Sequence, residues 1–340
     1  MSMISFDSVW AILVMAALLI VAVINSVHQA EVIAHKTGEP FGTLVLAVAV
    51  TIIEVALIVS IMLAAGEGSE LIARDSVFAA IMIVTNGVIG VSIFLGGLKH
   101  NELSFRVEGT NSGLAVLIAL ATLTLVLPVV TTSSPGPTFT EGQLIFAGVS
   151  SLVLYFTYVF IQTVRHRGYF LPLDEDERED PQVHAEPPSN LKTAVSAALL
   201  LVSLVAVVAL AKALSPAIEH AISDAGAPRS VVGIVIAALV LLPEGVSAVR
   251  AAMAKRLQTS LNLALGSALA SIGLTIPAVA IVSVFFHLPL SLGLDALGMT
   301  FLALTFLLAI LTMAIGRTTV LQGVVHLVVF AAYLFMSLVP

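Results

Sequence analysis

Long apolar runs dominate this sequence and restrict what it can fold into. Hydrophobic residues make up 59% of its 340 residues and charged residues only 10%, against roughly 25% charged residues in a soluble domain. Each run approaches the roughly 20 residues that a helix needs to cross a bilayer. We therefore expect an all-α polytopic membrane protein of about ten transmembrane helices, embedded in a lipid bilayer. The expected spans are 8–30, 41–65, 74–98, 110–130, 141–164, 191–213, 230–254, 259–287, 291–315 and 318–338.

Basic residues predict how these spans are oriented. Eleven of the 14 Lys and Arg residues fall in the loops after the odd-numbered spans, and such residues mark the cytoplasmic side of a membrane. Both termini are then outside. A long polar loop divides the chain into residues 1–165, a cytoplasmic acidic linker at 166–190, and residues 191–340. Because each half holds five spans, the second half inserts upside down, which predicts two inverted five-helix repeats.

Two carboxylates lie near the centres of apolar spans. Glu54 lies in the run 46–62 and Glu244 in the run 233–249. A charge at the bilayer centre costs about 2.5–3.5 kcal/mol on insertion scales, and intramembrane acids are usually functional. Neither glutamate has a basic residue within one turn on its own helix. Each must therefore be protonated, bind a cation, or do both in turn. A protonated glutamate bonded to a neighbouring helix is the structural alternative, and it explains a pair less well.

A weak internal repeat precedes the two glutamates. In each half, a Glu-Gly-Pro series with the same spacing comes before the membrane glutamate. The series are Glu31, Gly38 and Pro40 in the first half and Glu219, Gly226 and Pro228 in the second. Glu31 and Glu219 are expected near the ends of spans 1 and 6, on opposite sides of the membrane. They are candidates for the two access routes, although ordinary interfacial charges would look the same.

Oxygen-bearing side chains in the spans are candidate ligands, because hard cations such as Ca²⁺ and Na⁺ prefer oxygen. We select Asn86 in span 3, Thr51 one turn before Glu54, and Ser267 and Ser271 in span 8. Small polar residues also join membrane helices, and for Ser271, Thr275 and Thr85 taken singly this is the better explanation. The bulkier amide of Asn86 deep in a span favours a ligand instead.

Pro243, directly before Glu244, is a further candidate. A proline inside a helix removes a backbone hydrogen bond, and the carbonyls of a broken membrane helix coordinate ions in some transporters. A plain kink is the alternative. The second half is thus expected to supply more backbone oxygens to a site, and the first half more side-chain oxygens.

Other kinds of site find little support. The chain has no cysteine, so disulfides and thiolate metal sites are excluded. Residues 174–186 are acidic but do not match an EF-hand loop, and they are read as a solvated linker or a cation-attracting segment. Most histidines lie in loops without zinc-type spacing. We expect no cofactor, no nucleic-acid partner and no enzymatic activity. A cation channel is an alternative to a transporter, and the oligomeric state stays open.

Three segments resemble a known family. They are AEVIAHKTGEPFGTLVLAVAVTIIEVALIVSIML, ARDSVFAAIMIVTNGVIG followed by GLKHNEL, and LPEGVSAVRAAMAKRLQTSLNLALGSALASIGLTIP. They look like the ChaA-type cation/proton antiporters of the Ca²⁺/cation antiporter superfamily, which are related to Ca²⁺/H⁺ exchangers. The resemblance implies two inverted repeats, with Glu54 and Glu244 binding cation and protons alternately.

The resemblance also implies a function and a place in the cell. We expect an antiporter of a bacterial inner (plasma) membrane that exports Ca²⁺, and also Na⁺ or K⁺, in exchange for H⁺. One departure bears on selectivity. Vacuolar-type Ca²⁺/proton exchangers carry Asn three residues before each membrane Glu, whereas this chain has Thr51 and Leu241 there. A mainly monovalent Na⁺(K⁺)/H⁺ antiporter is therefore the alternative.

Overall fold

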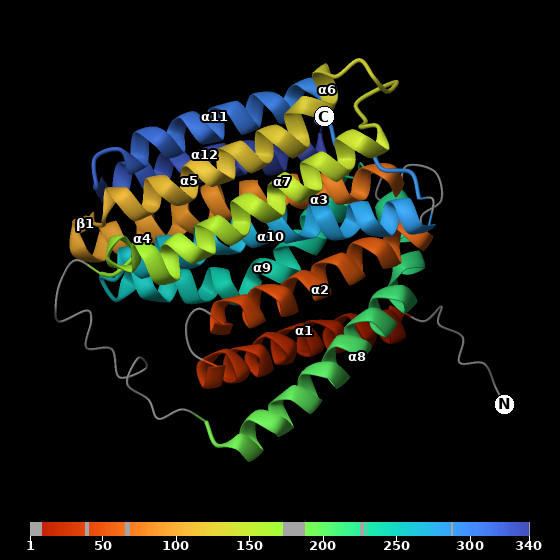
Figure 1. The fold of residues 1–340 in the computed structure, drawn as a ribbon, viewed down its shortest axis with the longest axis horizontal. Helices are drawn as coiled ribbons and strands as arrows, with labels where there is room; N and C mark the ends of the chain where they lie inside the picture. The colour runs from red at the N-terminus through yellow and green to blue at the C-terminus, as the bar shows by residue number, and fades with distance from the viewer. Residues whose placement is uncertain are drawn as a thin grey trace.

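The computed structural model describes residues 9–37, 41–64, 69–172, 188–224, 228, 230–286 and 288–339. These residues form ten long helical runs (Figure 1). The runs are α1 (Val9–Thr37), α2 (Phe41–Ala64), α3 (Ile72–Met82) leading through η2 (Ile83–Val88) into α4 (Ile89–His100), α5 (Val107–Ala121) leading through η3 (Thr122–Val126) into α6 (Leu127–Val130), α7 (Glu141–Phe160) with η4 (Ile161–Arg165), α8 (Asn190–Asp224), α9 (Ser230–Met253), α10 (Leu257–Phe286), α11 (Ala296–Met313) and α12 (Val320–Leu338). A single 3₁₀ turn, η1 (Ser69–Leu71), precedes α3, and another, η5 (Arg167–Tyr169), follows η4.

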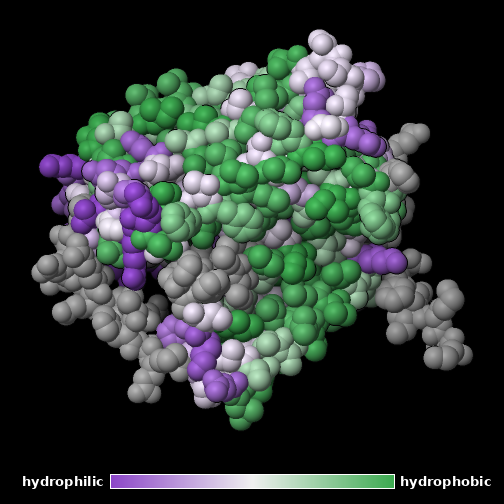
Figure 2. All heavy atoms as spheres, viewed as in Figure 1, coloured by the Kyte–Doolittle hydropathy of each residue, from purple (hydrophilic) through white to green (hydrophobic). Residues whose placement is uncertain are grey.

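These helices confirm the prediction of a polytopic α-helical membrane protein. Within the described residues, nine helical runs are long and apolar enough to cross a membrane, and α2 adds the shorter apolar stretch Val48–Leu63. Figure 2 shows hydrophobic residues over the middle of the visible face and hydrophilic residues gathered toward the ends of the helices. That distribution suits a bilayer, whose hydrocarbon core is about 30 Å thick.

Several details differ from the sequence prediction. Helices α1 and α8 end at Thr37 and Asp224, beyond the expected ends at 30 and 213, because a helix packed along a neighbour continues past its apolar core. Glu31 and Glu219 therefore lie within helices. Helix α9 is continuous through Pro243, so the predicted alternative of a broken helix is wrong. The acidic segment 174–186 lies outside the described residues.

Local irregularities were also missed. The runs that contain η2, η3 and η4 each include a π-helical turn, a feature often found at functional sites. Strands β1 (Glu102–Ser104) and β2 (Arg317–Thr319) pair antiparallel, with Leu103 opposite Thr318. Three-residue strands give too short an alternation to be recognised in a sequence. This pairing joins the loop after α4 to the loop before α12.

Two groups of buried apolar side chains hold the helices together. One group joins α1, α2 and α8, which form the lower part of Figure 1. The larger group joins α3, α4, α5, α7, α11 and α12. Helices α3, α9 and α10 contribute to both groups. The boundary between the two groups is therefore where α2, α9 and α10 meet.

Candidate functional site

Glu54 lies at this boundary, on the side of α2 that faces α10. Its side chain is 1% exposed. The Thr275 hydroxyl, on α10, donates a hydrogen bond of 3.0 Å to Glu54 Oε2. Ser271, one turn earlier on α10, also interacts with the Glu54 carboxylate. Residues spaced four apart share a helix face, so α10 presents a row of hydroxyls to this carboxylate.

Glu244 approaches the same place from α9. It is half-buried, and its charge interacts with that of Glu54. The glutamates thus come from different halves of the chain, 190 residues apart in sequence, on two helices that both pack against α10, and their charges act on each other. Two carboxylates in a poorly solvated environment repel each other unless a proton or a cation neutralises them.

Seven buried side-chain oxygens of the described residues have no hydrogen-bond partner, and three of them belong to Glu54, Glu244 and Thr51. Within the described residues, Thr51 Oγ1, Glu54 Oε1 and Glu244 Oε2 are all buried and unpaired. Thr51 lies one turn before Glu54 on α2 and is 8% exposed. Buried polar atoms in native proteins are nearly always paired, so each exception calls for an explanation. One explanation is a bound cation, because hard cations take oxygen atoms as ligands. Another is a protonated carboxyl, whose O–H would donate a hydrogen bond to a neighbouring oxygen.

The other candidates divide between this place and elsewhere. Ser271 belongs to the row that faces Glu54. Ser267 is half-buried and lies one turn before Ser271 on α10. Among the described residues, no hydrogen bond joins it to either glutamate. Pro243 adjoins Glu244 inside a continuous helix, where its ring leaves the carbonyl of Leu239 without the usual helical donor.

Asn86 lies in η2 and is bonded away from the glutamates. Its Nδ2 donates to Thr305 Oγ1 at 2.8 Å, and its Oδ1 lies 2.9 Å from His326 Nδ1. These partners belong to α11 and α12. His326 could not be singled out from the sequence, because a single histidine in an apolar run has no spacing pattern. Nor did it distinguish Thr275 from the other hydroxyls.

Glu31 extends the acidic region from α1. Its charge interacts with that of Glu244, and its side chain is 54% exposed. His28 lies 4.0 Å from it, one turn earlier. The side chain of Glu219 lies outside the described side chains. Glu31 therefore connects Glu244 with exposed surface.

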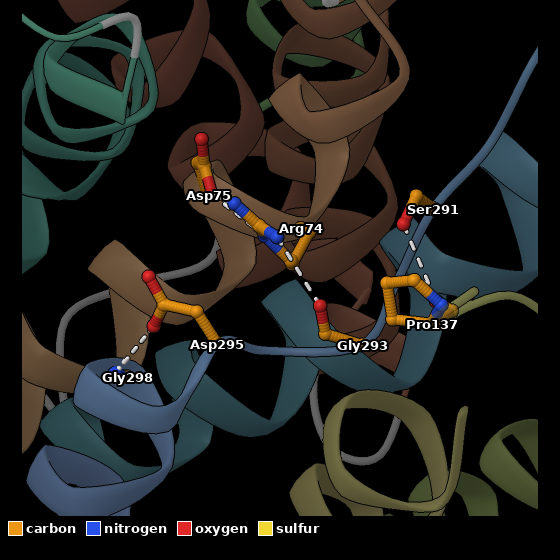
Figure 3. Close-up of polar contacts among 7 residues, drawn as sticks. All are labelled: Arg74, Asp75, Pro137, Ser291, Gly293, Asp295 and Gly298. Carbon is orange, nitrogen blue, oxygen red and sulfur yellow. Dashed lines mark hydrogen bonds and ion pairs between the residues drawn. The ribbon is translucent and has the colours of Figure 1, made fainter. Parts of the chain in front are cut away.

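A second charged cluster lies at the start of α3 (Figure 3). The Arg74 guanidinium contacts Asp75 Oδ1 at 2.7 Å and donates to the Gly293 carbonyl at 3.2 Å. Asp295 caps α11, where its Oδ1 accepts from the Gly298 amide at 2.6 Å. A cavity of about 100 Å³ adjoins these groups. Because Arg74 already neutralises Asp75, this cluster suits a structural ion pair better than a cation site.

No cluster of three or more His, Cys, Asp or Glu side chains suited to a metal ion occurs in the part of the chain that the structure describes. The glutamate pair supplies two carboxylates, with the hydroxyls of Thr275 and Ser271 beside Glu54.

Known proteins match nearly the whole of this chain. The family model described as sodium/calcium exchanger protein matches residues 8–164 and 195–339. The y4hA protein of Sinorhizobium fredii is 50% identical over 98% of this chain and 90% of its own length. The sodium-potassium/proton antiporter ChaA of Escherichia coli is 35% identical over 91% of this chain and 83% of its own length.

Solved structures share the fold. The structure of native YfkE matches with a TM-score of 0.73 at 17% identity, covering 97% of this chain and 92% of that one. The resemblance to ChaA-type antiporters, inferred above from three segments of sequence, is confirmed by the match to ChaA. On the strength of the family match, which covers most of the sequence, this chain belongs to the sodium/calcium exchanger protein family.

Proposed function

We propose that this chain is a secondary transporter that exchanges cations for protons across a bacterial inner (plasma) membrane by alternating access. Glu54 and Glu244 form one site that holds either the cation or protons. The observation that carries the proposal is the set of three buried, unpaired oxygens, Thr51 Oγ1, Glu54 Oε1 and Glu244 Oε2. The similarity of this chain to the sodium-potassium/proton antiporter ChaA of Escherichia coli supports the coupling of cation transport to protons.

The chemistry of two buried carboxylates couples the two fluxes. When both are ionised, a cation between them removes the cost of two like charges in a poorly solvated place. When both are protonated, they are neutral and the cation has no counter-charge. The two loaded forms therefore exclude each other. On the outer side the glutamates take protons and release the cation, and on the more alkaline cytoplasmic side they lose protons and bind a cation.

The transported ion is Ca²⁺, with Na⁺ and K⁺ as further substrates. Two carboxylates match the charge of Ca²⁺, and hydroxyls such as those of Thr51 and Ser271 complete an oxygen ligand set for any of these ions. The second candidate is a mainly monovalent exchanger, which the relationship to ChaA of Escherichia coli favours. The cation is cargo in either case, and the cycle requires no resident cofactor.

Access to the site follows from its surroundings. We assign Glu31 to one route, because it is exposed and its charge acts on Glu244. Glu219 is assigned to the other route by the internal repeat, with residues 1–165 and 191–340 as the two inverted halves. Glu31→Gln is expected to slow exchange several-fold without abolishing it, because the site remains intact. An unchanged initial rate of cation-driven proton movement would remove Glu31 from the route.

Everted membrane vesicles that carry a pH gradient test the proposal. Adding Ca²⁺, Na⁺ or K⁺ should collapse the gradient, and a pH-sensitive dye reports the rate. Glu54→Gln and Glu244→Gln should each abolish the response, since either change removes one of the two charges. Glu141→Gln is the matched control, because Glu141 is exposed at the start of α7. Normal exchange in either glutamate variant would rule out the shared site.

A further inference from the structure

A buried chain of polar side chains joins η2 to α11 and α12. Asn86, Thr305 and His326 are each 0% exposed, and Thr312 is 7% exposed. Asn86 contacts Thr305 and His326 as described above, and the Thr312 hydroxyl lies 3.0 Å from His326 Nε2. The Thr305 hydroxyl in turn lies 3.3 Å from Met82 Sδ. The proposed exchange site uses none of these contacts.

The donors and acceptors in this chain fit one arrangement. Asn86 Oδ1 can only accept, so His326 must carry its proton on Nδ1 to bond it. His326 Nε2 then accepts from the Thr312 hydroxyl. Asn86 Nδ2 donates to Thr305, whose hydroxyl is left to donate to the sulfur of Met82. Every polar atom has a partner when the histidine is neutral, and the orientation of the Asn86 amide is fixed from both ends.

The same segment of chain touches the helix of Glu244. Asn86 lies at the centre of η2, the π-helical turn of this run. Val88, at the end of η2, lies so close to Gly245 that a Cβ there would come within 3.1 Å of its Cγ2. On the other side, a Cβ at Gly90 would come within 3.1 Å of the Cβ of His326. The turn is thus packed between α12 and the residue that follows Glu244.

A purely structural contact does not need these residue types. Buried polar networks cost desolvation and are often replaced by apolar packing without loss of stability. What a fully hydrogen-bonded network does provide is a single fixed arrangement of the side chains and helices that it joins. A π-helical turn holds one extra residue compared with α-helix, so its position decides how the residues beyond it face their neighbours.

We infer that His326 is a positioning residue for cation exchange: through Asn86 it holds the η2 turn against α9 and so places Glu244. This inference rests on the proposed exchange function. Loss of the Nδ1–H donor leaves Asn86 Oδ1 buried without a partner and frees the turn to shift. The cation affinity of the site should then fall, because Glu244 no longer lies where Glu54 can share the ion.

Vesicle exchange with three variants tests this role. His326→Leu should raise the cation concentration for half-maximal exchange at least tenfold and change the maximal rate less. His326→Asn, whose amide can donate from the place of Nδ1, should recover most of the affinity. Thr312→Val is the matched control, because it removes only the contact to Nε2. His326→Leu with wild-type affinity overturns the inference.

A double variant separates positioning from general damage to the fold. If His326 acts through Asn86, His326→Leu should add no further loss of affinity in an Asn86→Ala background. If His326→Leu lowers the cation affinity in the Asn86→Ala background as much as it does in the wild type, the histidine acts through another residue. The melting temperature of each purified variant is measured alongside, and a loss of affinity found only in variants with lowered melting temperature would also overturn the inference.

A spectroscopic readout tests the arrangement without any transport. In ¹⁵N spectra of histidine-labelled protein in lipid nanodiscs, His326 is identified by its disappearance in His326→Asn. It should show the Nδ1–H tautomer and lose that preference in Asn86→Ala. An Nε2–H tautomer in the wild type would overturn the inference even if exchange is normal. If wild-type vesicles show no cation-driven proton movement, the exchange function fails while the tautomer result still stands.

Discussion

Replacing Thr275 by valine removes one hydrogen bond from Glu54 and leaves a side chain of similar shape in α10. The bond is 3.0 Å long, and both of its partners are buried. A hydrogen bond to a charged group contributes about 1.5–3 kcal/mol, and each 1.4 kcal/mol is about a tenfold change in an equilibrium constant. Because the hydroxyl supports the ionised carboxylate that holds the cation, Thr275→Val should weaken cation binding roughly 10- to 100-fold.

Everted vesicles give the measurement. The cation concentration for half-maximal collapse of a pH gradient should rise by that factor in Thr275→Val. Thr275→Ser keeps the donor and should stay within a few-fold of the wild type. Thr300→Val removes a hydroxyl from α11 that bonds only its own helix, at Ala296, and should have no effect. If Thr275→Val binds cations as the wild type does, the Thr275 contact has no part in the site.

Two further predictions concern stability, measured by unfolding of the purified protein in detergent. Arg74→Gln should lower the unfolding free energy by about 3–5 kcal/mol, because it leaves Asp75 buried without its counter-charge; Arg317→Gln, which breaks an exposed ion pair, should cost no more than about 1 kcal/mol. Gly233→Ala should cost about 1–3 kcal/mol, because a Cβ there would lie 2.6 Å from the carbonyl carbon of Asp75. Gly266→Ala, with nothing within 4 Å of the added carbon, should be neutral, and a similar loss in both glycine variants would contradict the packing argument.

The membrane spans and the two glutamates are predictable because a large free-energy cost governs each of them. Backbone groups without hydrogen bonds are so unfavourable in lipid that only helices or closed barrels span it. An ionised acid at membrane depth costs several kcal/mol, so such residues are usually functional. Glu54 and Glu244 stand out on that ground alone. Treating the second half as an inverted copy of the first predicts that these two glutamates share one site.

The ligands around the glutamates were harder to predict because the energies are small and depend on contacts. Thr275 and Ser267 lie two turns apart on the same helix, yet of these two only Thr275 has a hydrogen bond to Glu54 among the described contacts. Asn86, selected as a ligand because an amide is unusual at membrane depth, bonds Thr305 and His326 instead. A sequence does not show which neighbour a polar side chain reaches.

Backbone features were missed for a similar reason. A proline such as Pro243 costs about 3 kcal/mol in a helix interior, yet α9 is continuous through it. The π-helical turn η2 has no signature in the residues 83–88 themselves. Tight packing of glycines such as Gly87 and Gly90 against α12 accompanies it, and that contact joins segments far apart in the sequence.

The most direct test counts protons released when the cation binds. Isothermal titration calorimetry of the purified protein, repeated in two buffers with different ionisation enthalpies, gives that number for Ca²⁺, Na⁺ and K⁺. The account predicts that cation binding to the wild type releases protons, and that Glu54→Gln and Glu244→Gln each lose both the binding and the release. Cation binding without proton release, or with the same release in either variant, would contradict a site in which the two glutamates hold cation and protons in turn.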